Sequence, residues 1–157
     1  ICVQGYCNMI EYHVNTEATA ETIDKQGWLH TGDLGTMDSR GYVRVTGRVK
    51  EMIIRGGENM FPAEIENVLL EHPSILEVAV VGLPDEKWGE IVACFVRAAT
   101  ADVIDPQDLH THCRQNMSPQ KTPVLWFQVE AFPLTGSGKI RKFELRDRYL
   151  AGEYESL

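Results

Sequence analysis

Apolar positions recur at helix or strand spacing through the second half of the chain. Pro62 suits the first position of a helix because it has no N–H to leave unpaired, and the residue before Pro73 avoids the helical region, so a helix is predicted between them. Ile65, Val68, Leu69 and His72 then recur at helical spacing. Near-continuous or alternating apolar runs predict strands over residues 75–82, 90–97 and 124–129.

Two more helices follow from the same reasoning. Asp105 is a good N-cap before Pro106, and Leu109, Cys113 and Met117 then line one apolar face. A last helix is expected over residues 140–150, with Ile140, Phe143, Leu145 and Leu150 partly facing inward. The order helix, strand, strand, helix, strand, helix predicts an α+β domain of about a hundred residues, with a three-stranded sheet packed by helices.

The first third of the chain has little apolar material. We expect a short helix over 16–23 capped by Thr16, a buried strand over 28–31, and a turn over 37–42 that leads into a strand over 42–46. This β-rich segment is too small for its own core and should pack against another part of the protein. The chain begins at Ile1 inside an apolar run without an initiator Met, and we expect a fragment of a longer protein.

Residues 47–66 combine charges, a short apolar run and a glycine pair before the helix at Pro62. Gly56 and Gly57 allow positive φ and close approach of another group, so the stretch predicts a strand, a tight glycine loop and a helix. The charges on both sides of the loop suggest a functional loop. A β-hairpin end with solvated Lys and Arg side chains explains the spacing equally well.

Composition excludes several classes of function. A net charge of -8 and a pI near 5.1 argue against a nucleic-acid partner and fit a cytoplasmic protein. No apolar run is long enough for a transmembrane segment. The cysteines and histidines show no metal-binding spacing, and Cys94 and Cys113 are expected as reduced core residues.

Four charged residues are candidates for chemistry. Lys139 ends a glycine-rich arm over residues 133–139, which we expect to be flexible, and an ammonium suits carboxylate and phosphate oxygens. Asp33 follows a glycine at the end of a strand, where a carboxylate can accept both hydroxyls of a ribose. Arg48 can bind phosphate or ribose, and Lys50 lies between the two halves of the chain. Taken singly, each is also explained as a solvated surface charge or, for Asp33, a turn residue that caps its own backbone.

Together, three ordered motifs resemble the late motifs of adenylate-forming enzymes. They are residues 28–33 (WLHTGD), 47–66 (from GRVK to EIE) and 133–140 (PLTGSGKI). That superfamily includes acyl-CoA synthetases, peptide-synthetase adenylation domains and luciferases. The resemblance implies that a carboxylic acid and Mg-ATP form an acyl-adenylate and diphosphate, after which the CoA thiol displaces AMP to give acyl-CoA.

The resemblance also implies domains and roles. Residues 1–46 match the end of the large N-terminal AMP-binding domain, 47–51 a hinge, and 52–157 a small C-terminal lid domain with the three-stranded sheet and a β-hairpin. By match, Asp33 holds the AMP ribose, Arg48 the ribose or phosphate, and Lys139 bridges the substrate carboxylate and the α-phosphate. Lys50 falls at the hinge and Gly57 at the pantetheine channel. Asn59 stands where some relatives carry a phosphate-binding arginine, so it receives no role.

Residues 135–142 and 55–59 look most like medium- or long-chain fatty acyl-CoA ligases. We therefore expect a fatty or medium-chain acid as substrate, with ATP, Mg2+ and CoA, and with the N-terminal domain of the same protein as partner. The magnesium-binding residues are expected outside this chain, and the fragment alone should not turn over. An adenylation domain that loads a carrier protein and a stand-alone, non-catalytic interaction module remain the alternatives.

Overall fold

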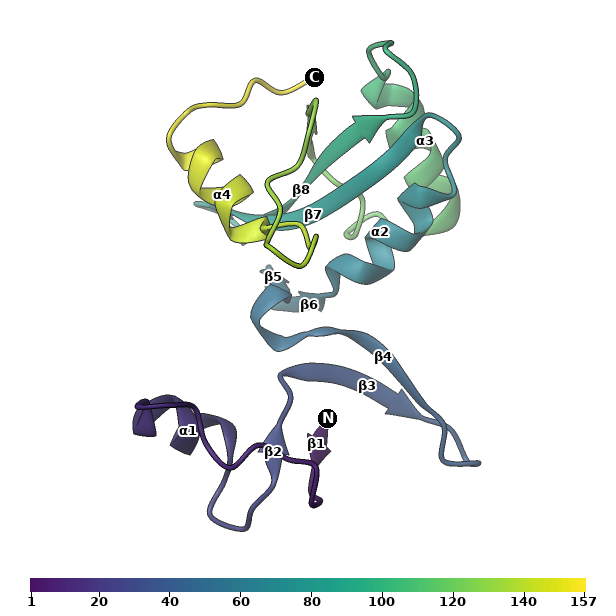
Figure 1. Cartoon of the computed structure of the whole chain (residues 1–157). Helices are drawn as coiled ribbons and strands as arrows, with labels where there is room; N and C mark the ends of the chain where they lie inside the picture. The colour runs from purple at the N-terminus through teal and green to yellow at the C-terminus, as the bar shows by residue number, and fades with distance from the viewer. The chain divides into compact units, whose positions relative to one another are not determined.

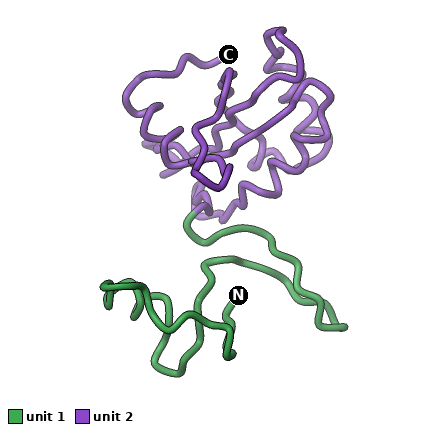
Figure 2. The backbone as a smooth tube through the Cα atoms, viewed as in Figure 1, with its two compact units in different colours: residues 1–50 green, residues 51–157 purple.

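The computed structural model describes all residues from Ile1 to Leu157, and the chain divides into two compact units (Figure 2). Unit 1 is Ile1–Lys50 and unit 2 is Glu51–Leu157. A 3₁₀ turn, η1 (Val49–Glu51), contains the boundary.

Unit 1 consists of two small antiparallel strand pairs and one helix (Figure 1). Its elements are β1 (Cys2–Val3), α1 (Thr16–Thr22), β2 (Leu29–His30), β3 (Asp33–Met37) and β4 (Val43–Arg48). β1 pairs with β2, and β3 pairs with β4. No side chain in this unit is fully buried, which agrees with the small amount of apolar material in its sequence.

Two local expectations for unit 1 are wrong. Asn15, not Thr16, caps α1, because its side-chain oxygen accepts a hydrogen bond from the Ala18 N–H at 3.0 Å. The strand expected over 28–31 contains no buried residue: β2 covers only Leu29 and His30, Leu29 is half-buried, and Trp28 is 41% exposed. The turn before β4 is confirmed, since Asp38 accepts backbone hydrogen bonds from Arg40 and Tyr42.

Unit 2 is built on a mixed sheet that carries helices on both faces. Its strands are β5 (Ile53–Arg55), β6 (Glu58–Met60), β7 (Ile75–Asp85), β8 (Gly89–Ala98) and β9 (Leu125–Gln128). Its helices are α2 (Pro62–Leu70), α3 (Pro106–Asn116) and α4 (Lys142–Leu150). The predicted α+β class is confirmed.

The three expected strands are β7, β8 and β9, and they form the long part of the sheet. The expected β-hairpin is β5–β6, and it joins β8 through a single pair, Arg55 with Gly89, so the sheet consists of the three expected strands and the two strands of the hairpin. β7 also runs three residues past the expected end at Gly82, through Pro84 to Asp85.

Alternating side chains of β7 and β8 divide the core between the two faces of the sheet. One face packs against α2 and α3 and includes Val78, Val80, Val92, Cys94 and Val96. The other packs against Leu145 of α4 and includes Ala79, Val81, Ala93 and Phe95. Figure 1 shows α2 and α3 on one side of β7 and β8, and α4 on the other. The core of the molecule therefore lies wholly within unit 2.

The helix predictions are largely confirmed, with one correction in α4. Asp105 caps α3 by accepting a hydrogen bond from the Gln107 N–H at 2.9 Å. α4 begins at Lys142, two residues later than expected, and of its apolar residues only Leu145 is buried. Phe143 and Leu150 are exposed, contrary to the expected inward orientation.

The two cysteines of the core are free and buried, as predicted. Burial raises the pKa of the Cys113 thiol to about 11 and raises that of Cys94 well above its ordinary value, because the apolar core disfavours a thiolate. Both side chains therefore stay neutral and act as small apolar packing residues.

No helix of the structure combines the length and the apolar character needed to cross a membrane.

Candidate active-site elements

Asp33 and Arg48 face each other across the β3–β4 hairpin. They are register partners at the open end of the hairpin, and the Arg48 Nε lies 2.9 Å from Asp33 Oδ1. A bulge between Leu34 and Gly35 shifts the register so that this pairing occurs. The Asp33 side chain is 25% exposed and that of Arg48 is 58% exposed, so both can still contact a ligand.

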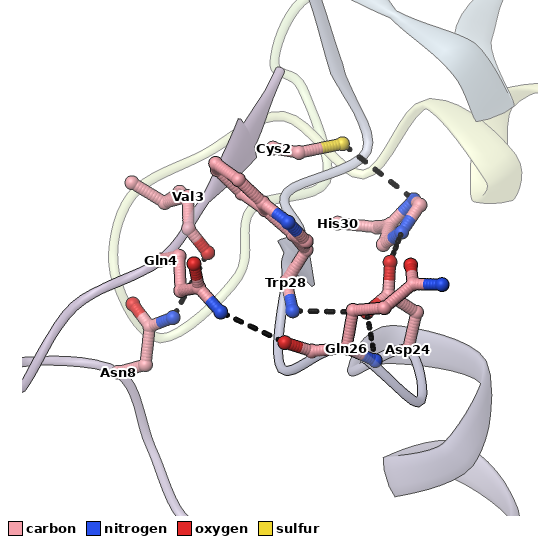
Figure 3. A network of polar contacts seen from close by, with 8 residues as sticks. All are labelled: Cys2, Val3, Gln4, Asn8, Asp24, Gln26, Trp28 and His30. Atoms are coloured by element: carbon pink, nitrogen blue, oxygen red, sulfur yellow. Dashed lines mark hydrogen bonds and ion pairs between the residues drawn. The ribbon is translucent and has the colours of Figure 1, made fainter.

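The segment before Asp33 is fixed by hydrogen bonds centred on Asp24. Figure 3 shows that its carboxylate contacts the backbone N–H groups of Gln26 and Trp28 and the His30 ring. These hydrogen bonds lower the pKa of the Asp24 carboxyl, and the one from the Trp28 N–H has the largest effect. Asp24 therefore stays ionised and continues to act as an acceptor. Thr31 then accepts a hydrogen bond from the Asp33 N–H at 3.0 Å. The turn around Asp24 and strand β2 are hydrogen-bonded to each other, and together with Thr31 they fix the position of Asp33.

Lys50 lies in η1, at the last position of unit 1. Its side chain is exposed, and none of the ion pairs of the structure involves it. The preceding residue is anchored, because the Val49 N–H donates to the Gly32 carbonyl at 2.9 Å. The chain is thus held up to Val49 by unit 1, and Lys50 follows that anchor directly.

Gly57 occupies the turn between β5 and β6 rather than a loop that leads directly into a helix. Gly56 and Gly57 both have positive φ, +58° and +86°, as a two-residue hairpin requires. A Cβ on Gly57 would meet no atom within 4 Å, whereas one on Gly56 would lie 2.9 Å from the Trp88 ring. Gly56 is therefore needed for packing, and Gly57 presents bare backbone to open space.

A cavity of about 250 Å³ lies beside this turn. It is lined by Arg55, Gly56, Glu58, Met60, Trp88 and Gln120. Arg55 donates to the Gln120 carbonyl at 2.6 Å and stands 5.7 Å from the centre of the Trp88 ring. Trp88 lies on the rim of this cavity and is 43% exposed.

Lys139 lies on a closed loop between β9 and α4. Leu134 and Ile140 form an antiparallel bridge at its base, and the Arg141 N–H donates to the Pro133 carbonyl at 2.8 Å. The glycine-rich arm expected to be flexible is therefore a hydrogen-bonded turn. The Lys139 side chain is exposed, and none of the ion pairs of the structure involves it.

A neighbouring lysine has a different environment. Lys142 Nζ contacts Glu66 at 2.7 Å and Glu51 at 2.9 Å, and its side chain is only 21% exposed. Lys139 is thus free to bind an anionic ligand, whereas the ammonium of Lys142 is already paired with two carboxylates of the protein.

The structure brings together one pair of the predicted residues, Asp33 and Arg48. Lys50 also lies in unit 1, whereas Gly57 and Lys139 lie on separate loops of unit 2. Sequence reasoning missed Thr135, whose hydroxyl contacts the Lys139 backbone. Its place four residues before Lys139, at the start of a Gly-Ser-Gly turn, was the available signal.

The side chains present fit a nucleotide better than a metal ion. The second carboxylate oxygen of Asp33 is free to accept hydrogen bonds from a ribose. The terminal nitrogens of Arg48 are free to donate to ribose or phosphate oxygens. No group of three or more His, Cys, Asp or Glu side chains is arranged to hold a metal ion.

Comparison with known proteins identifies the family. Residues 64–139 match the model of the AMP-binding enzyme C-terminal domain. The chain is 45% identical over 149 residues to a fatty acid–[acyl-carrier-protein] ligase of Streptomyces coeruleorubidus, covering 95% of this chain and 28% of that protein. It is 40% identical over 148 residues to a mitochondrial medium-chain acyl-CoA ligase of Rattus norvegicus, covering 94% of this chain and 24% of that protein.

A solved structure gives the same result for the fold. The o-succinylbenzoate CoA synthetase of Bacillus subtilis, in complex with an acyl-adenylate intermediate, matches 93% of this chain with a TM-score of 0.86 and 34% identity. The chain covers 30% of that protein, so it spans about a quarter to a third of the length of these relatives. The resemblance seen in the three sequence motifs is confirmed: the chain belongs to the adenylate-forming superfamily and contains its AMP-binding enzyme C-terminal domain.

Proposed function

We propose that this chain is the C-terminal part of a cytoplasmic, ATP-dependent acyl-CoA synthetase that acts on a fatty or medium-chain acid. The full enzyme would convert acid, ATP and CoA into acyl-CoA, AMP and diphosphate through an acyl-adenylate. The placement of Lys139 carries the proposal: an unpaired ammonium stands exposed on a closed loop within a family whose relatives include acyl-CoA ligases.

Lys139 is the proposed catalytic residue of the adenylation step. Adenylation brings a carboxylate and the α-phosphate together, and their mutual repulsion raises the barrier. A positioned cation between the two anions offsets that repulsion as the new bond forms. The absence of a protein carboxylate partner supports this role, because Lys139 does not first have to break an ion pair.

Asp33 and Arg48 are the proposed nucleotide-binding pair. Asp33 would accept hydrogen bonds from the ribose hydroxyls, and Arg48 would donate to ribose or phosphate oxygens. Their ion pair supports this assignment because each side chain holds the other in place before the nucleotide arrives.

Lys50 and Gly57 are proposed to serve the change between the half-reactions. Residues 47–51 would form the hinge between the large domain, which includes residues 1–46, and a lid of residues 52–157. Gly57 would line the path of the pantetheine thiol, where the open space around its Cα leaves room for a ligand.

The test is Lys139→Ala in the full-length protein, with Lys25→Ala as the control for loss of an exposed lysine. We expect acid-dependent exchange of diphosphate with ATP to fall by roughly a hundredfold or more, because a charge that acts in the transition state is lost. Thioester formation from supplied acyl-adenylate should survive in both variants. Wild-type exchange in Lys139→Ala contradicts the proposed role.

A carrier protein is the second candidate acceptor, because one relative is a fatty acid–[acyl-carrier-protein] ligase. Presenting the preformed acyl-adenylate enzyme with CoA or with a phosphopantetheinylated carrier protein distinguishes the two. Faster acyl transfer to CoA supports the synthetase, and faster transfer to the carrier supports the alternative.

We also expect the 157-residue chain alone to be inactive, because the proposed lid acts on ligands held by another domain. Acid-dependent diphosphate release by this chain alone contradicts that expectation. A stand-alone interaction module would have no such activity at any length of the protein, so the full-length assay separates the module from the enzyme.

A further inference from the structure

The loop that carries Lys139 is held by one side chain above all. The Thr135 Oγ1 accepts a hydrogen bond from the Lys139 N–H at 3.0 Å. The Thr135 N–H donates to the Lys139 carbonyl at 2.8 Å, so one residue binds both polar groups of the Lys139 backbone.

The same threonine also closes the tip of the loop. The Gly138 N–H donates to the Thr135 carbonyl at 2.9 Å, and the hydroxyls of Thr135 and Ser137 lie 3.0 Å apart. Gly138 has a φ of +79°, which turns the chain back toward Thr135 without the strain that a side chain would add. The turn is therefore organised around Thr135, and it returns the chain at the position where Lys139 begins.

Only the backbone of Lys139 is fixed in this way. Its side chain has four rotatable bonds and no partner in the protein. The region that its ammonium can reach therefore depends on the direction of the Lys139 Cα–Cβ bond. The hydroxyl of Thr135 sets that direction through the Lys139 N–H. The Lys139 N–H has no other partner in the protein, so loss of the hydroxyl would fix the peptide plane before Lys139 less closely, while the Lys139 carbonyl would keep its bond from the Thr135 N–H.

We propose that Thr135 is a positioning residue for Lys139, which acts through its hydroxyl to aim the ammonium during adenylation. This inference rests on the function proposed above for Lys139. Thr135 touches no reacting group: its effect passes through the Lys139 backbone. A small misplacement of a catalytic group can cost as much as a hundredfold in rate, so the loss of a single exposed hydrogen bond matters more here for rate than for stability.

The main test compares Thr135→Val with Thr135→Ser in the full-length protein. Valine keeps the shape of the side chain and removes the acceptor, and serine keeps the acceptor. We expect Thr135→Val to lower kcat of the adenylation step by roughly tenfold to a hundredfold with little change in KM for ATP or acid. Thr135→Ser should recover most of the rate, and the melting temperature of both variants should stay close to wild type.

Two controls separate positioning from a general effect on the fold. Thr111→Val makes the same chemical change at an exposed threonine of α3 that bonds only within its helix, and should leave adenylation unchanged. Thioester formation from supplied acyl-adenylate should also be unchanged in Thr135→Val. Equal slowing of both half-reactions, or a serine variant as slow as the valine variant, overturns the proposal.

A double variant connects this inference to Lys139 and keeps the two proposals distinguishable. If Thr135 acts through Lys139, Thr135→Val adds no further loss of adenylation to Lys139→Ala. Further slowing in the double variant overturns the positioning role while leaving the role of Lys139 intact. If Lys139→Ala alone keeps the wild-type rate, the proposed function of Lys139 fails first, and the inference about Thr135 fails with it.

Discussion

Gly56 and Gly57 are adjacent residues that lack a side chain for different reasons. Gly56 lies under Trp88, and its N–H donates to the Trp88 carbonyl at 2.8 Å. A Cβ on Gly57 would meet no atom within 4 Å, so this position requires glycine only for its positive φ. The sequence places both in one loop, and only the packing around them separates a structural glycine from a candidate ligand-facing one.

The difference between the two glycines predicts an energetic coupling. Gly56→Ala should destabilise unit 2 by about 1–3 kcal/mol, partly through left-handed strain and partly through the clash with Trp88. In a Trp88→Ala background the clash disappears, so the cost of Gly56→Ala should fall by about 0.5 kcal/mol or more. Urea unfolding of the single and double variants measures this term. Gly57→Ala is the matched control, and its cost should be the same with or without Trp88.

Elements whose signals are local were predictable from the sequence. Pro62 and Pro106 at the first positions of α2 and α3 act within a single turn of backbone, as does the Asp105 cap. The candidate residues Asp33, Arg48, Gly57 and Lys139 were found because short motifs contain them. What the motifs did not contain was the hydrogen bonding around these residues, such as the contact between Thr135 and Lys139.

Elements that depend on distant partners were missed or misplaced. The β-hairpin was expected, but the bounds of its second strand were not, because β6 has three residues and only Met60 among them is buried, which leaves no apolar period in the sequence. β7 continues past Gly82 through Pro84 because β7 is a terminal strand of the sheet, where a missing N–H is tolerated. Ile140 belongs to the base of the Lys139 loop instead of α4. The Asp33–Arg48 pairing depends on a bulge that nothing in the residue order reveals.

Lys142 connects three elements of unit 2. It starts α4, and its ammonium contacts Glu51 of η1 and Glu66 of α2. Glu66 in turn accepts a hydrogen bond from the Val80 N–H of β7 at 2.8 Å. The first residue of unit 2 is thus tied to the body of the domain through one partly buried cation.

This arrangement predicts a stability effect larger than that of a surface ion pair. Lys142→Met should lower the free energy of unfolding of unit 2 by about 1–3 kcal/mol, because two carboxylates lose their shared partner in a partly desolvated place. Arg148→Met is the control in the same helix, because the Arg148 side chain is 44% exposed and pairs with a single carboxylate, that of Glu144, so its loss should cost clearly less stability than that of Lys142. Equal losses in the two variants contradict the connecting role of Lys142.

At the scale of the whole molecule, all buried apolar side chains belong to unit 2. They begin at Ile53 and end at Leu145, and unit 1 contributes none. A domain folds alone when it has its own core, so the two units should differ in autonomy.

The expected result is that residues 51–157 unfold cooperatively on their own, whereas residues 1–50 show no cooperative transition. Thermal scans followed by circular dichroism, together with limited proteolysis of the longer chain, measure this. The first protease cuts should fall in unit 1, because its backbone is the less protected by packing. A cooperative transition in the isolated residues 1–50 contradicts the assignment of the core.

The boundary between Lys50 and Glu51 also has a consequence for recombination. A crossover at that peptide bond separates no pair of buried side chains, because every one of them lies on the C-terminal side. The contacts of Lys142 with Glu51 and Glu66 also stay together on the C-terminal side of this bond. The Asp33–Arg48 pair stays together on the N-terminal side. We therefore expect that residues 51–157 can be exchanged as one segment between related genes, because their core, the glycine hairpin and the Lys139 loop are transferred together.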